Sequence, residues 1–116
     1  MNPSLRACIA NLAARLAGQT VNSTVYDHTQ AKHIRISGNA SAESVNLHEH
    51  DRDSYLTGPP SSLYDHVQRA HLSLVVQGTK LSGYDHGSRY HYSGDINGHS
   101  VIIFDHQSKT HHHYDV

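Results

Sequence analysis

A short motif recurs through most of this chain and constrains what it can fold into. Tyr-Asp-His occurs three times, and in each copy a second histidine follows five residues after the first. Phe-Asp-His repeats the pattern once more, and His48-Glu49-His50 followed by Tyr55 gives a degenerate fifth copy. The copies begin at residues 26, 48, 64, 84 and 104, so their starts are 22, 16, 20 and 20 residues apart. Such a period means that one supersecondary unit has been copied along the chain.

The size and charge of the chain limit its class. Its 116 residues predict a single domain, 1–116, with one modest core. The formal net charge of −1 argues against nucleic acid or an anionic membrane as a partner. One cysteine and no long apolar stretch exclude an intrachain disulfide and indicate a cytoplasmic, reduced protein. The 13 histidines should make the charge strongly positive between about pH 7.5 and 5.5.

One helix is expected, over residues 2–17. Asn2 can cap it, Pro3 suits its first position and Gly18 is the expected stop. The residues that form one apolar stripe at helical spacing are Leu5, Cys8, Ile9, Leu12 and Leu16. The polar residues off this stripe are Arg6, Asn11 and Arg15.

The rest of the chain, residues 21–116, has the pattern of short strands. Apolar and polar residues alternate on both sides of each motif, as in strands with one buried face. The residues expected on the core side are Val25, Leu47, Leu63, Gly83 and Ile103 before the motifs, and Ile34, Ile36, Leu72, Leu74 and Val76 after them. The four polar residues between the paired histidines fit hairpin loops, and turn signals join the units. Five hairpin repeats therefore predict an up-and-down antiparallel meander of about ten short strands.

The width of such a sheet decides its shape. Ten strands would span about 48 Å, whereas a helix of 15 residues is only about 22 Å long. A flat sheet could not be covered by this helix. We therefore expect a mainly β protein with one N-terminal helix (α+β), in which a strongly curled sheet or barrel packs on the helix. A dimer that completes the core is the alternative.

Strand alternation also places the motif residues. The aromatic residue and the histidines should share the polar face, with the two histidines of each unit facing each other across the hairpin. The predicted binding face is Tyr26, His28, His33, Tyr64, His66, His71, Tyr84, His86, His91, Phe104, His106 and His111. The acidic residue should lie on the opposite face and accept hydrogen bonds from loop amides. These turn-stabilising residues are Asp27, Glu49, Asp65, Asp85 and Asp105.

The motif favours a structural or binding role over catalysis. Equal turns in every repeat need the same turn chemistry, and tyrosine-rich strand faces suit recognition. We therefore expect a non-enzymatic scaffold that has no cofactor. It should bind another protein or form a homo-oligomer, in a pH-sensitive manner. A hydrolase built on one Asp-His pair is the weakest alternative, because no nucleophile elbow or oxyanion loop accompanies it.

Metal binding is the main alternative function. Cross-strand imidazoles suit Zn²⁺, Ni²⁺ or Cu²⁺. The proposed ligand pairs are His28 with His33, His66 with His71, His86 with His91 and His106 with His111. Each loop also holds one basic residue, but the motif acids nearly cancel this charge, so ion pairing between hairpins is expected there rather than anion binding.

Three further residues or segments have plain structural interpretations. Cys8 lies on the apolar helix stripe and is expected to be a buried, inert thiol. His99 follows a turn signal at the end of the sheet opposite the motifs, where it should be solvated. His111 completes the fourth intact motif, so residues 111–116 are expected to form the last strand.

Overall fold

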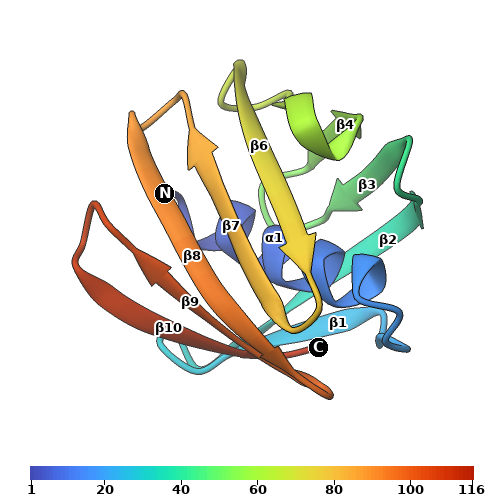
Figure 1. The fold of residues 1–116 in the computed structure, drawn as a ribbon, viewed down its shortest axis with the longest axis vertical. Helices are drawn as coiled ribbons and strands as arrows, with labels where there is room; N and C mark the ends of the chain where they lie inside the picture. The colour runs from blue at the N-terminus through green and yellow to red at the C-terminus, as the bar shows by residue number, and fades with distance from the viewer.

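The polypeptide forms a closed β-barrel around one helix (Figure 1). The structure is a computed structural model and describes residues 1–116. Ten strands follow the helix α1 (Pro3–Leu16), and a short 3-10 helix η1 (Pro60–Ser62) precedes the fifth strand. The strands are β1 (Thr24–Asp27), β2 (Lys32–Ala40), β3 (Val45–Glu49), β4 (Ser54–Gly58), β5 (Leu63–Asp65), β6 (Ala70–Gln77), β7 (Lys80–Asp85), β8 (Tyr90–Asn97), β9 (Ser100–Asp105) and β10 (Thr110–Asp115).

The strands run up and down in sequence order, and β1 pairs with β10 to close the barrel. Every neighbouring pair is antiparallel, so the predicted meander of five hairpins is confirmed. Closure solves the problem of width, because a sheet that returns on itself can enclose a helix much shorter than the sheet is wide. The molecule is nearly isometric, with principal extents of 29 × 28 × 28 Å.

The helix α1 lies within the barrel, where it packs against β1, β2, β3, β6 and β9. The Asn2 side chain caps it by accepting hydrogen bonds from the backbone N–H groups of Ser4 and Leu5. At the other end, Gly18 has φ +84°, and the bonds from Gly18 and Gln19 back to the last turn form a Schellman motif. With 14 residues, this helix is too short to cross a membrane.

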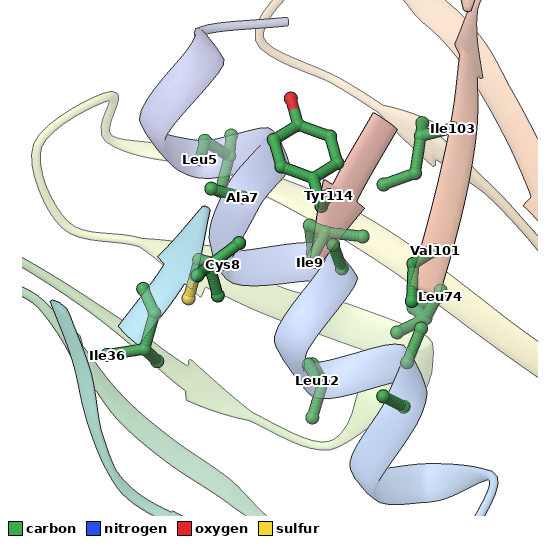
Figure 2. Packing of buried hydrophobic residues seen from close by; sticks show 14 of the residues in the cluster. Leu5, Ala7, Cys8, Ile9, Leu12, Ile36, Leu74, Val101, Ile103 and Tyr114 are labelled. Carbon is green, nitrogen blue, oxygen red and sulfur yellow. The ribbon is translucent and has the colours of Figure 1, made fainter. Parts of the chain in front are cut away.

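Burial of α1 is more complete than its sequence pattern indicates. Every residue from Ser4 to Ala14 is buried, including Arg6 and Asn11, which lie off the apolar stripe. The expectation of a single buried stripe was therefore too narrow, because a barrel surrounds the helix on all sides whereas an open sheet covers one side. Figure 2 shows the helix side chains among those of the barrel wall, with Tyr114, Ile103 and Val101 on one side and Ile36 on the other.

The motif loops begin one residue earlier than expected. In the first hairpin Asp27 pairs with Lys32, so the loop is residues 28–31 and the first histidine belongs to it. The last loop residue has a positive φ of 52° to 65° in all five hairpins, at Ala31, Asp53, Arg69, Arg89 and Lys109. None of these residues is glycine, so composition alone did not indicate a left-handed position.

The turns at the opposite end are of a second kind. Two-residue loops at Gly78-Thr79 and Gly98-His99 connect β6 to β7 and β8 to β9. Each has a glycine with φ 60° at its first central position, which matches the type II′ hairpin turn. His99 is exposed there, at the end away from the motifs, as expected.

A glycine inside the barrel wall makes room for a buried ring. Gly83 pairs with Tyr92 across β7 and β8. A Cβ at Gly83 would lie 2.0 Å from the carbonyl oxygen of Ser73 and 2.4 Å from the Tyr92 hydroxyl. The Tyr92 hydroxyl donates a 2.5 Å hydrogen bond to that same carbonyl of Ser73. Glycine is therefore required at this point, so that the ring can cross β7 and reach β6.

If the helix fills the barrel, shortening its buried side chains should lower the free energy of unfolding. Leu12 is fully buried, and Leu12→Ala should lower the free energy of unfolding by about 2–5 kcal/mol. Val67→Ala removes a side chain that is 50% exposed and should change it by about 0.5 kcal/mol or less. Urea unfolding followed by circular dichroism measures both. Equal losses in the two variants would contradict a helix packed in the lumen.

Candidate functional site

A belt of paired aromatic and imidazole rings surrounds the outside of one barrel mouth. In four motifs the aromatic ring contacts both histidines of its unit, with ring centroids 4.7–5.0 Å apart. These rings are Tyr26, Tyr64, Tyr84 and Phe104. In the degenerate copy, His48 stands at the position of the aromatic residue and Tyr55 at that of the second histidine. Their rings stack with centroids 4.4 Å apart. All predicted binding-face residues lie on this outer face, as strand alternation indicated.

The cross-strand partners within each hairpin differ from the expected ones. The second histidine pairs with the aromatic residue and not with the first histidine, as in Tyr26 with His33 and Tyr84 with His91. The expectation that the two histidines of one unit face each other across the hairpin is therefore wrong. The reason is the loop boundary, because the acidic residue ends the strand and leaves the first histidine in the loop.

The histidine that directly follows the acid in each motif instead lies beside the preceding hairpin around the barrel. For His28 that neighbour is the last hairpin of the chain. In each motif the backbone N–H of this histidine donates to a carbonyl of the neighbouring hairpin at 3.0–3.2 Å. The pairs are His28 with His113, His50 with Arg35, His66 with Tyr55, His86 with His71 and His106 with His91. Backbone hydrogen bonds therefore link each motif loop to the neighbouring hairpin, including across the seam where β1 meets β10. Stacked rings join two hairpins at that seam, where His28 lies on His113.

The motif acids form a ring on the inside of the same mouth. Asp27, Glu49, Asp65, Asp85 and Asp105 are all at most 1% exposed. Each accepts at least one hydrogen bond of 2.7–3.2 Å from a backbone N–H of its own loop. A carboxylate at the base of each loop thus satisfies amides that would otherwise be unpaired.

Two arginines compensate part of this buried negative charge. Arg52 lies between two hairpins, 2.6 Å from Glu49 and 3.0 Å from Asp65. Arg6 reaches the ring from the helix and donates to Asp105 at 3.1 Å and to the Tyr114 hydroxyl at 2.6 Å. The N-terminus of α1 also points to this end, and its partial positive charge favours carboxylates there.

Asp105 is held in its ionised form by its neighbours. Burial raises the pKa of this carboxyl, but hydrogen bonds from the Met1 amine and the Gln107 N–H, with the charge of Arg6, outweigh burial. The pKa of Asp105 therefore lies below its usual value. The Met1 amine is 3.0 Å from the carboxylate, and both groups are nearly inaccessible to solvent.

The opposite orientations of acid and histidine bear on the hydrolase alternative. Asp27 points into the barrel and binds loop amides, whereas His28 points outward and contacts Asp115. No motif acid hydrogen-bonds to the histidine that follows it in the tripeptide. The adjacent Asp and His of the tripeptide, which suggested a catalytic dyad, therefore do not hydrogen-bond to each other.

Two imidazoles resist protonation. His50 is exposed, but partial desolvation of its ring, followed by the charge of His48, lowers its pKa. Burial and Arg6 also lower the pKa of His112, which faces the barrel interior at 8% exposure. Both histidines should stay neutral at a pH where ordinary histidines gain a proton.

The outer face over β6 to β9 is hollowed into two adjoining grooves with volumes of about 250 and 370 Å³. Ser93 lines both grooves, and small residues such as Gly83 and Gly94 are also among the lining residues. The larger side chains around them are Val75, Tyr84, Ile102 and Phe104, together with His91, His106 and His111. Val75 is 50% exposed and Ile102 is 38% exposed. Apolar surface is thus grouped with part of the belt.

Other predicted residues have the positions that their patterns indicated. Cys8 is buried, and burial raises the pKa of its thiol to about 12, so it is unreactive at neutral pH. The histidine-rich tail forms β10. Of the basic loop residues, Lys32 pairs with Asp51 of the next hairpin at 3.0 Å, while Arg69 and Arg89 are exposed.

Comparison with protein-family models, with curated proteins and with solved structures gives no match for this chain. The function must therefore be inferred from the site itself.

Sequence reasoning predicted ion pairing between hairpins by the basic loop residues, as Arg52 shows with Asp65, but it missed two other contacts. Arg6 was not recognised as a partner of the acidic ring, and Asp115 was not recognised as a neighbour of His28. A weak indication was present for Arg6, because Asn2 and Pro3 mark the start of the helix and Arg6 therefore lies near its N-terminal end. No local signal joins His28 to β10, because closure of the barrel alone brings them together.

Loss of Arg52 should leave buried carboxylates without compensation. Arg52→Gln should lower the free energy of unfolding at pH 7 by about 3–5 kcal/mol, as for other broken buried ion pairs. Arg89→Gln changes an exposed arginine of an equivalent loop and should cost about 0.5 kcal/mol or less. Chemical denaturation of both variants tests this, and a similar loss in each would refute the compensating role.

The lowered pKa of Asp105 predicts a specific acid sensitivity. A carboxyl with a lowered folded-state pKa contributes stability above its unfolded pKa of about 4, and this is lost as pH falls further. Asp105→Asn should therefore be less stable than the wild type at pH 7 but lose less stability between pH 7 and 3. Thermal unfolding across this range measures the difference. Parallel pH profiles for the two proteins would argue against it.

Proposed function

We propose that this protein is a non-enzymatic binding module that self-associates through the outer groove over β6 to β9. The observation that carries the proposal is the grouping there of exposed apolar side chains with part of the aromatic-imidazole belt. Val75 lines one of the two adjoining grooves, Ile102 and Phe104 line the other, and serine and glycine residues line both. Rigid aromatic side chains with polar neighbours are typical of protein interfaces.

The closed barrel restricts how two copies can meet. All ten strands have partners on both sides, so no free edge remains for pairing with a strand of another molecule. Association must then use side chains of an outer face. The chain's formal charge of −1 allows two copies to approach without strong mutual repulsion. Lys80 and Asp95 at one end of the groove neutralise each other.

The groove should respond to pH. Its imidazole side chains are His91, His106 and His111, the charged groups beside them are Lys80 and Asp95, and the two tyrosines that line it are Tyr84 and Tyr92. Protonated imidazoles carry positive charge, so two facing grooves would repel each other in acid. We therefore infer a dimer that is favoured at neutral or alkaline pH and dissociates in acid.

Sedimentation velocity of untagged protein in EDTA tests this function. We expect a dimer at pH 7.5 and a monomer at pH 5.5. Ser82→Arg adds a bulky charge at an exposed position that lines the groove and should give a monomer at both pH values. Asn46→Arg makes the same change at an exposed position on β3 and should leave the dimer intact.

Two results would overturn the proposal. One is a wild-type monomer at both pH values and at high protein concentration, which would leave the groove to a different protein. The other is equal dimerisation of the two arginine variants, which would place the interface elsewhere on the barrel. EDTA removes metal-mediated association, so the result reports on the groove itself.

A further inference from the structure

Two imidazoles and a carboxylate converge at the seam that closes the barrel. His28 lies just beyond β1, while His113 and Asp115 are on β10. The possible ligand atoms of these three side chains all lie within 4.8 Å of one another. The Nε2 atom of His28 is 2.8 Å from one Asp115 oxygen, and that of His113 is 3.9 Å from the other. The two imidazole rings stack at 4.6 Å.

The same position can be compared in all five hairpins. In each, the first histidine contacts the preceding strand, and a polar side chain lies two residues further along that strand. At four of the five positions this residue carries a hydroxyl, namely Ser37, Thr57, Ser73 and Ser93. Ser37 and Thr57 bond to the histidine Nε2 at 2.8 Å. Only at the seam is the residue a carboxylate, Asp115.

A second comparison separates this cluster from the other histidine pairs. His86 lies beside His71, and His106 beside His91, in the same backbone arrangement as His28 beside His113. Their polar neighbours are Ser73 and Ser93, which are poor metal ligands. Three of the five contacts between hairpins therefore bring two imidazoles together. Of these three, only the contact of His28 with His113 also has a carboxylate, that of Asp115.

The seam is also among the places where the barrel has the fewest strand pairings. The β1–β10 contact has two paired positions, as has β4–β5, whereas β6–β7 has six. A group that joins β1 to β10 would therefore support the closure of the barrel.

We propose that His28, His113 and Asp115 bind a divalent transition-metal ion, of the Zn²⁺ class, across this seam. Imidazole and carboxylate are ligands that such ions accept, with a water at a fourth tetrahedral position. Ligands about 2.0–2.1 Å from a tetrahedral ion are about 3.3 Å apart. The observed separations bracket this value, so small side-chain rotations suffice. All three side chains are 43–54% exposed, which gives the ion access.

The bound ion would connect the first strand of the barrel to its last. It should bind the closed barrel and not the unfolded chain, and so stabilise the fold by mass action. The proposal uses β1 and β10, and it does not depend on self-association through the groove.

Calorimetric titration with Zn²⁺ tests the site, on protein purified without a metal column and stripped with a chelator. We expect one ion per chain and a higher melting temperature with Zn²⁺. Asp115→Ser installs the type of residue found in the other hairpins. It should weaken binding by about tenfold or more, since loss of even a supporting group costs a metal site about 10- to 100-fold. His86→Gln, which alters an equivalent pair without a carboxylate, should bind as the wild type does.

A gain of binding provides the converse test. Ser93→Asp places a carboxylate beside His91 and His106, in the position that Asp115 has beside His28 and His113. This variant should bind two ions per chain by native mass spectrometry, and the Ser93→Asp/Asp115→Ser double variant should bind one. Circular dichroism shows whether each variant is folded.

The proposal fails if Asp115→Ser binds Zn²⁺ as tightly as the wild type, or if His86→Gln weakens binding equally. It also fails if folded Ser93→Asp binds no second ion, because the carboxylate would then not be the deciding ligand.

Discussion

Burial of the helix α1 inside the barrel is the constraint on which the rest of the structure depends. A closed ring of ten strands has no unpaired edges, but it encloses a space that must be filled. This chain fills it with its own N-terminal helix, in which every residue from Ser4 to Ala14 is buried. The small alanine side chains let the barrel wall approach the helix, while Leu5, Ile9 and Leu12 fill the remaining volume. The core thus forms within one chain and needs no second copy.

The polar end of the barrel follows from this arrangement. The helix points its N-terminus at the mouth where the five motif loops lie, and the motif acids face inward around it. Each acid stabilises its own loop through backbone amides, and Arg6 and Arg52 compensate part of the charge. A single tripeptide therefore serves two faces of the barrel wall. Its acid organises the interior of the rim, and its aromatic residue and histidine form the exterior belt.

The features that all five hairpins share have structural roles. The positions at which the hairpins differ are the ones on which the functional proposals depend. All five hairpins share the inward acid, the left-handed last loop residue and the outward ring pair. The hairpins differ in a few outer residues. The serines and glycines over β7 and β8 leave a groove, and Asp115 replaces a hydroxyl at the seam. The groove and the cluster of His28, His113 and Asp115 both arise from such differences between otherwise equivalent positions.

The sequence by itself determined the local structure of this protein. Asn2, Pro3 and Gly18 mark the helix, strict alternation marks the strands, and the sheet's width requires strong curvature. These signals depend on interactions between residues close in the chain, which local propensity and spacing describe well. The one-residue error in the loops arose because Ala31 and its counterparts adopt positive φ without being glycine. Only the tertiary structure decided which hairpins are neighbours across the closing seam, how far the helix is surrounded, and which histidines meet. His28 and His113 come together because the barrel closes, and closure is a property of the whole sheet that no local segment encodes.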